Sequence, residues 1–333
     1  MSKHLFFLYH HYLGRKTYLF LFLFLSLSCL SCTSEDENDY YTEPKKEIPS
    51  ILDKDYSYRF VGAEKFMNLD ETVAGGQGGA SFGNYFFQGY NGNSIMDVFD
   101  LKKKEFVCRM QVPAPPGNKR YHVNTINFGN QFVNEEDKFP VLYVCSGYTI
   151  TEKSTDSYVF VYRIKEVGEK SFDLELIQTI TLRDFCVDKW TEAVIDNEHD
   201  AIWVKSESCI YRKFTIPHIS EGDCILTPYE NVLDEINLGI QPFYSHNQGH
   251  LFYEDRIILV TGVPSWGETI ALVVINTLLG KREHVLDLFE IGLVDKSNNG
   301  NNYFEPESVI VYDGQVMICY RKAIYKLLRD EAH

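Results

Sequence analysis

Short apolar runs alternate with turns along most of this 333-residue chain. The runs are rich in Val, Ile, Phe and Tyr, and the turns are rich in Gly, Asn and Asp. Alternation with a period near two, bounded by turn residues, is typical of β-strands, whereas the 3.6-residue period of a helix is almost absent. The pattern therefore predicts an all-β body.

Five segments of the body share one layout: a polar starter, an apolar strand, a turn and a second, more apolar strand. The starters lie at residues 77, 122, 190, 246 and 305. A third strand is expected in each segment, at 94–99, 157–164, 209–214, 269–275 and 323–327. A fourth is expected in the first four, at 106–112, 174–182, 225–238 and 281–288. Four-stranded units repeated at this spacing predict the blades of a β-propeller.

The fifth segment has no fourth strand of its own. Residues 56–69 are strand-like and otherwise unpartnered, so we expect them to supply that strand from the N-terminal side and to cover two open sheet edges. The prediction is a five-bladed propeller over residues 56–330. A six-bladed propeller, with a blade missed within 150–245, and a non-repetitive β-sandwich are the alternatives.

The N-terminal region has the pattern of an export signal. Lys3, Arg15 and Lys16 precede an apolar run at 18–30, which ends in small residues. The run is shorter than the roughly twenty residues that a membrane-spanning helix needs. We therefore expect a signal peptide at 1–31 and a flexible acidic tether at 32–55.

Cysteines lie at the small-residue end of this signal, and an acidic stretch at 35–39 follows them. This arrangement resembles the surface lipoproteins of the Bacteroidota that carry a β-propeller domain. The resemblance implies a lipid on the first residue of the mature chain and a location at the outer membrane, on the cell surface. Cys32 is favoured over Cys29 because the polar segment begins directly after it. A merely solvated linker is the alternative interpretation of the acidic stretch.

Charge excludes one class of partner. Removing residues 1–31 leaves 32 − 3 = 29 basic residues against 47 acidic ones, a net charge of −18. Such a chain repels nucleic acids and anionic lipid head groups, so we expect neither DNA nor RNA as a partner, and membrane contact through the anchor only. We expect a monomer. The six cysteines beyond the signal are not at metal-ligand spacing; Cys145 and Cys319 end apolar strands, and Cys209 and Cys224 are a possible disulfide pair.

The first strand of each blade lines the centre of a propeller, so polar residues at its start converge on one axis. Seven polar residues at or just after the starters have this position: Gln77, His122, Glu192, His246, Gln248, Glu305 and Glu307. Two aromatic residues, Tyr90 and Trp266, follow second strands, and Arg321 can add positive charge. Flat rings beside hydrogen-bonding groups suit sugar rings. The alternative is a purely structural role, in which these groups form hydrogen bonds with one another and with buried water.

Three uses of the convergent groups are open. Glu192, His122, His246 and Glu305 can hold a divalent cation. Two carboxylates among Glu192, Glu305 and Glu307 can act as acid and base on a glycan, as hydrolase or lyase. The whole set can instead bind an extracellular glycan or a partner protein through hydrogen bonds.

Catalytic signatures are missing from the sequence. It has no nucleophile elbow, P-loop, zinc-protease or dinucleotide motif. Starters of the types Glu, His and Gln also depart from the two Asp and one Glu of five-bladed glycosidases. A binding module is therefore the leading hypothesis, an enzyme the second, and a scaffold in an outer-membrane complex the third.

Overall fold

The computed structural model divides the chain into two compact units, residues 1–47 and 48–333. The residues that the structure describes all lie in the second unit: 60–69, 76–90, 94–113, 123–146, 156–185, 192–206, 210–239, 247–264, 267–293 and 305–329. The expected signal peptide, Cys29, Cys32 and the tether lie outside them. Within the described ranges, no helix is long and apolar enough to cross a membrane.

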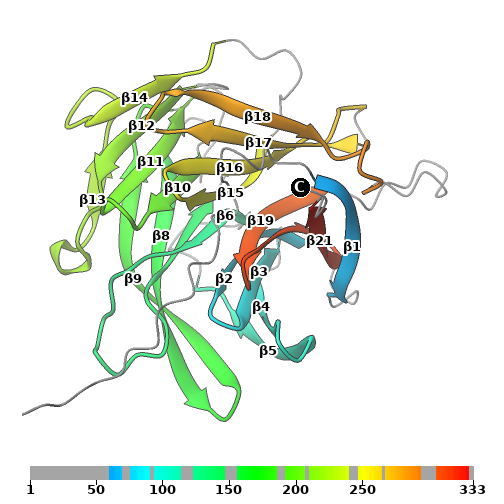
Figure 1. The fold of residues 1–333 in the computed structure, drawn as a ribbon. Coiled ribbons are helices and arrows are strands. Elements are labelled where there is room, and N and C mark those ends of the chain that lie inside the picture. Colours follow the sequence, from blue (N-terminus) through cyan, green and yellow to red (C-terminus); the bar gives the residue numbers. More distant parts are fainter. Residues whose placement is uncertain are drawn as a thin grey trace, which may run out of the picture. The chain divides into compact units, whose positions relative to one another are not determined.

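Five sheets form the five blades of a β-propeller (Figure 1). The first blade runs β2 (Gly76–Phe82), β3 (Tyr85–Tyr90), β4 (Ile95–Asp100), β5 (Glu105–Gln111). The second runs β6 (Val123–Phe128), β7 (Leu142–Ser146), β8 (Ser157–Gly168), β9 (Ser171–Leu182). The third runs β10 (Glu192–Asp196), β11 (Ala201–Ser206), β12 (Ile210–Thr215), β14 (Asp234–Asn237). The fourth runs β15 (Asn247–Tyr253), β16 (Arg256–Thr261), β17 (Ala271–Asn276), β18 (Lys281–Asp287).

The fifth blade joins the two ends of the domain. It runs β19 (Pro306–Tyr312), β20 (Gln315–Tyr320), β21 (Ala323–Arg329), and β1 (Phe60–Asn68) is its outermost strand. β1 pairs antiparallel with β21 from Phe60 opposite Arg329 to Asn68 opposite Ala323. The five-bladed prediction with an N-terminal closing strand is confirmed, and the six-bladed and sandwich alternatives are wrong.

One predicted strand is wrong. Residues 225–238 were expected to be the fourth strand of the third blade, but they form β13 (Cys224–Leu226) and β14. β13 pairs in parallel with β9, so it adds a fifth strand to the second blade. Between them, Pro228 cannot donate a hydrogen bond and Asn231 has φ of 58°, which breaks the extended chain.

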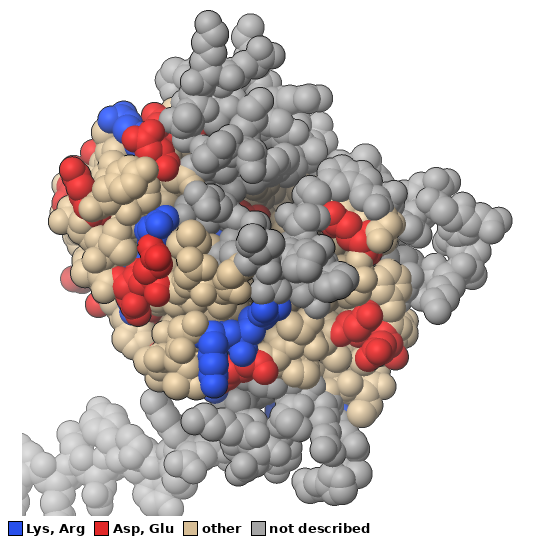
Figure 2. Space-filling view, turned by 90° about the horizontal axis from the view of Figure 1, so that it is seen from above, with Lys and Arg blue, Asp and Glu red and all other residues tan. Residues whose placement is uncertain are grey.

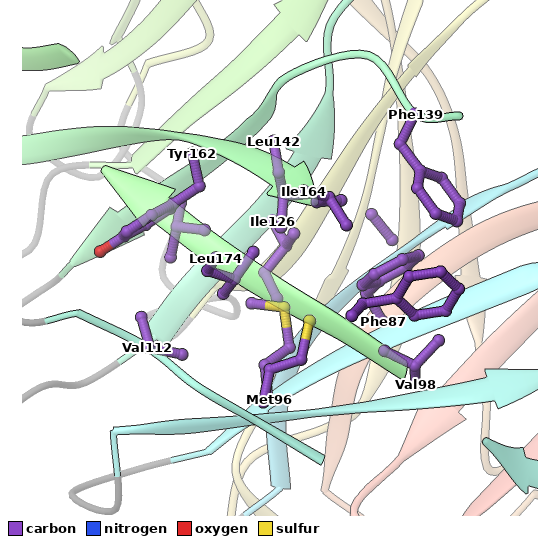
Figure 3. Close-up of a cluster of buried hydrophobic side chains, with 14 of the residues drawn as sticks. Phe87, Met96, Val98, Val112, Ile126, Phe139, Leu142, Tyr162, Ile164 and Leu174 are labelled. Atoms are coloured by element: carbon purple, nitrogen blue, oxygen red, sulfur yellow. The ribbon is translucent and has the colours of Figure 1, made fainter. Parts of the chain in front are cut away.

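Hydrophobic side chains pack between facing blades. Figure 3 shows one such cluster, in which Phe87 and Met96 of the first blade meet Ile126, Leu142 and Leu174 of the second. All five are buried. Cys145 and Cys319, which end apolar strands, are buried, and Cys224 is a free thiol. Cys209, its possible disulfide partner, lies outside the described residues.

The innermost strands approach one another closely at the centre of the ring. Each of β2, β6, β10, β15 and β19 contacts its two neighbours, and β15 also lies near β6 and β2 across the ring. A Cβ on Gly78 would lie 2.4 Å from the carbonyl oxygen of Asn124, and one on Gly249 would lie 2.6 Å from that of Glu307. Glycine is required at both positions because no side chain fits between the backbones.

Candidate functional site

Polar side chains meet where the innermost strands begin. Gln77 lies in β2, Glu192 begins β10, Gln248 lies in β15 and Glu307 lies in β19. Glu305 directly precedes β19, and Arg321 directly follows β20 of the same blade. The predicted residues His122, His246 and Trp266 lie outside the part of the chain that the structure describes. The described ones form two separate groups.

The first group, the Arg321 cluster, consists of Gln77, Gln248, Glu305, Glu307 and Arg321. Arg321 Nε donates to Glu307 Oε1 at 2.7 Å, and Nη2 pairs with Glu305 Oε2. Gln77 Nε2 donates to Glu307 Oε1 at 3.4 Å and Gln248 Nε2 to Glu305 Oε1 at 2.9 Å. Three blades thus contribute side chains to one guanidinium and its two carboxyl groups.

Glu307 is the most perturbed group of this cluster. Burial, together with the nearby charge of Glu305, raises its pKa to about 8 despite the opposing effect of Arg321. Its Oε2 atom is buried and has no hydrogen-bond partner among the described residues. The Arg321 side chain keeps 32% of its surface exposed, against 1% for Glu307. The cluster therefore connects a buried, protonated carboxyl group to solvent through one guanidinium.

The second group, the Glu192 cluster, consists of Glu192, Lys205, Tyr211 and His250. Lys205 Nζ donates to Glu192 Oε2 at 3.0 Å, and His250 Nε2 lies 3.6 Å from the same oxygen and 3.1 Å from the Tyr211 hydroxyl. Burial, reinforced by the charge of Lys205, lowers the pKa of His250 to about 3. This group is a neutralised, buried network that joins the third and fourth blades.

The two carboxylates named for a divalent cation each have a cationic partner already. Glu192 lies beside Lys205 and Glu305 beside Arg321, and a positive side chain next to each carboxylate opposes the approach of a second cation. Of the three candidate acid and base residues, Glu305 and Glu307 share Arg321, while Glu192 belongs to the other cluster.

The prediction that the Tyr90 ring is available to stack on a sugar is wrong. It is completely buried, and its hydroxyl donates to Asp97 Oδ2 at 2.7 Å. Asp97 also accepts from Arg109 Nε at 2.7 Å. Asp97 is fully buried in β4, and a buried carboxylate is stable only when it accepts hydrogen bonds. The Tyr90 hydroxyl supplies one of these hydrogen bonds. Tyr90 is therefore part of the first blade's interior and cannot stack on a sugar.

Lys205 and His250 are site residues that the sequence interpretation missed, and only Lys205 left a signal in the sequence. The turn between Asp196 and Ala201 sets the register of that hairpin and places Lys205 opposite Glu192. His250 follows Gln248 by two positions in the same strand. A register shift between Asn247 and His250 interrupts the alternation of this strand, so the direction of the His250 side chain could not be inferred from that of Gln248.

Acidic side chains dominate the charge of the chain but not any one region of the face in Figure 2. There, red Asp and Glu side chains are interspersed with blue Lys and Arg and with tan uncharged residues.

Comparison with known proteins adds no family. No known protein family and no curated protein matches the chain. Among solved structures, glutaminyl cyclase of Myxococcus xanthus is similar with a TM-score of 0.46 and 11% identity over 81% of this chain and 95% of that one. Aldose sugar dehydrogenase of Streptomyces coelicolor, in its PQQ-bound form, is similar with a TM-score of 0.45 and 8% identity over 80% and 98%.

Raptor of Chaetomium thermophilum is similar with a TM-score of 0.38 and 11% identity over 80% of this chain, which spans only 21% of the length of Raptor. Likenesses this distant carry no argument about activity or ligand. The chain is a five-bladed β-propeller by its own sheet order, and its function has to be argued from its own side chains.

Proposed function

We propose that this protein is a binding module, and that the Arg321 cluster is its ligand site. The observation that carries the proposal is the Oε2 atom of Glu307, a buried polar atom without a hydrogen-bond partner among the described residues. Such atoms are costly unless a water or a ligand completes them. The partly exposed Arg321 provides the connection from this atom to the medium.

The ligand class follows from the donors and acceptors of the cluster. A guanidinium, two carboxyl groups and two amides form hydrogen bonds in both directions, which suits the hydroxyl groups of an extracellular glycan. A polar segment of a partner protein offers similar groups and is the other candidate. The cluster carries no excess charge when Glu307 is protonated, so a neutral polyhydroxyl ligand meets no unpaired charge.

A binding assay tests this proposal. The full chain, solubilised in detergent, is applied to a glycan array, and the variants Gln248→Ala and Glu307→Gln are compared with it. We expect retention of a glycan class that Q248A weakens at least tenfold. The control variant Arg163→Ala removes an ion pair with Asp137 far from the cluster and leaves binding unchanged. Equal binding by Q248A and R163A rejects the assignment of the site.

The same site supports a second candidate, a glycan hydrolase or lyase. The supporting observation is that Glu307 is held as an acid at neutral pH beside a second carboxyl group, Glu305. A protonated carboxyl paired with a second carboxyl is the equipment of glycoside cleavage. Release of reducing ends from a bound glycan, lost in both E305Q and E307Q, supports the enzyme; binding without release supports the module alone.

The location belongs to the proposal as well. The N-terminal pattern of basic residues, apolar run and cysteine supports export and lipid attachment at Cys32, at the outer membrane and the cell surface. Metabolic labelling with an alkyne fatty acid is expected to mark the wild type and Cys29→Ala but not Cys32→Ala. Label that is retained in C32A and lost in C29A would place the lipid on Cys29 instead. Absence of label from the wild type and both variants would reject lipid attachment.

A further inference from the structure

Metal-ligating side chains gather at the opposite ends of two inner strands, away from the Arg321 cluster. Glu198 and His199 lie in the turn after β10, and Asp255 lies in the turn after β15, the neighbouring strand (Figure 1). One ligand atom from each of the three lies within 4.8 Å of the others. Glu198 and His199 are exposed and Asp255 is half-buried, so the group is open to solvent.

The contacts of His199 fix which of its nitrogens faces the group. Nδ1 lies 3.0 Å from Oδ1 of Asp196, a completely buried carboxylate. Because a carboxylate only accepts, Nδ1 carries a proton, and Nε2 is the nitrogen that faces the group. Histidines that bind metals are commonly held in this way, by a carboxylate on the other ring nitrogen.

The atom opposite Nε2 is also an acceptor. Asp255 Oδ1 lies 3.4 Å from it and is a buried atom that has no hydrogen-bond partner within the described ranges. A charge-assisted hydrogen bond would bring such atoms to about 2.7–2.9 Å. Two ligands that each lie about 2.1 Å from one tetrahedral ion are roughly 3.4 Å apart. The observed separation therefore fits two ligands of one cation better than a direct hydrogen bond.

The third ligand, Glu198, is positioned by the neighbouring blade. Glu198 Oε1 accepts from the backbone N–H of Glu254 at 2.7 Å, and Oε2 accepts from that of Asp255 at 3.2 Å. Edge-to-face contact with Phe252, at 6.2 Å between centroids, holds the His199 ring. Each carboxylate oxygen keeps a second lone pair for an ion. The two turns are thus locked together before any ion arrives.

We propose that Glu198, His199 and Asp255 bind a zinc ion, with Asp196 as the outer partner of His199. One imidazole with two carboxylates suits Zn²⁺, because Ca²⁺ prefers an all-oxygen shell of six to eight ligands. Three protein ligands leave the fourth position open to water or to a ligand group from the medium. The ion would join the third and fourth blades at the face opposite the Arg321 cluster.

Isothermal titration of ZnCl₂ into the full chain, freed of metals with a chelator and carrying no histidine tag, tests the proposal. We expect one saturable site per chain that Ca²⁺ does not displace. His199→Ala and Asp255→Asn are expected to weaken it at least 100-fold, and Asp196→Asn about 10–100-fold. Asp313→Asn, at the matching turn of the fifth blade, is the control and leaves affinity unchanged.

Folding and binding are separated by a second measurement. Circular dichroism and thermal unfolding of each metal-free variant show whether it is folded, and Glu198→Gln replaces any variant that is not. Zinc is expected to raise the Tm of the wild type and of D313N but not of H199A. Absence of a zinc site in the folded wild type, equal affinity in H199A, or displacement by Ca²⁺ overturns the proposal.

Discussion

Arg321 donates to Glu307 at 2.7 Å, yet Glu307 retains a raised pKa of about 8. A guanidinium at this distance ordinarily holds a carboxyl ionised. Here the removal of Glu307 from water outweighs it, and the second carboxylate, Glu305, shares the same guanidinium. The pair is therefore a poised proton site rather than a simple ion pair.

Glu307 gives stability a definite pH dependence. Its pKa is about 8 in the folded protein against 4.5 as the reference value, so the folded state binds the proton more tightly. The contribution is complete below pH 4.5 and is lost as pH rises towards 8, at most about 1.4 kcal/mol per pH unit. Urea unfolding at several pH values is expected to show this loss in the wild type. Glu307→Gln, an isostere of the protonated acid, is expected to remove it; an unchanged slope contradicts the assignment.

His250 produces the opposite dependence. Its pKa is lowered from 6.5 to about 3, so the unfolded chain takes up a proton that the folded chain refuses. This contribution is complete above pH 6.5 and is lost as pH falls towards 3. His250→Gln is expected to flatten the acid limb of the stability curve. His218→Asn is the control, because His218 is exposed and an asparagine can still cap the short 3-10 helix Ile219–Glu221. Equal loss of stability at acid pH in the two variants would rule out His250 as the cause.

Removing the guanidinium is expected to destabilise the fold. Arg321→Met leaves two buried carboxyl groups without their shared partner, and loss of one side of a buried ion pair costs about 3 kcal/mol. Arg163→Met leaves a single carboxylate without its partner, that of Asp137, whose side chain is 8% exposed against 1% for Glu307, and is expected to cost about 1 kcal/mol. The midpoint of urea unfolding measures both. A smaller loss in R321M than in R163M would show that the Arg321 cluster is not a structural element.

The close approach of the inner strands predicts a sharp difference between glycines. Gly78→Ala places a methyl group 2.4 Å from a backbone oxygen of Asn124, which cannot move aside, and should cost more than about 2 kcal/mol. Gly62→Ala in β1 meets only a leucine side-chain carbon at 3.7 Å and should be neutral or slightly stabilising. Thermal unfolding of the two variants distinguishes them; similar Tm values would mean that the ring centre is looser than described.

The sequence predicted the architecture because strand and turn residues are local signals that repeat. Alternation and turns at Gly83 and Gly314 were enough to place most strands, and the leftover strand at 56–69 then had one open partner. The pairing of β13 with β9 was not predictable in this way. It is supported by Gln178, which donates to the carbonyl oxygens of His218 at 3.1 Å and Gly222 at 2.7 Å. These contacts join segments far apart in the chain, and the periodicity of apolar residues does not predict them.

The candidate site was predicted in its members but not in its grouping. Gln77, Gln248, Glu305 and Glu307 were identified because they start the inner strands, and Arg321 as a source of positive charge. Which carboxylate meets which cation depends on side-chain reach across blades, which the sequence pattern does not contain. Tyr90 was misplaced because an aromatic at a strand end looks the same whether its hydroxyl meets solvent or a buried Asp97.

The pairing of β1 with β21 sets an order on how the domain is made. During synthesis, β1 is the first of these strands to leave the ribosome and β21 the last, so β1 has no partner to pair with until residues 323–329 have emerged. The first, third and fourth blades can form as soon as their own four strands exist, and the second blade gains β13 only after β12 has been made. A chain cut short before Ala323 would therefore keep four blades in an open arc and expose the edges that the fifth blade covers. Proteases that degrade incompletely folded proteins would find unpaired strands in such a product. The seven residues of β21 are therefore the last segment that the chain needs before the ring can close.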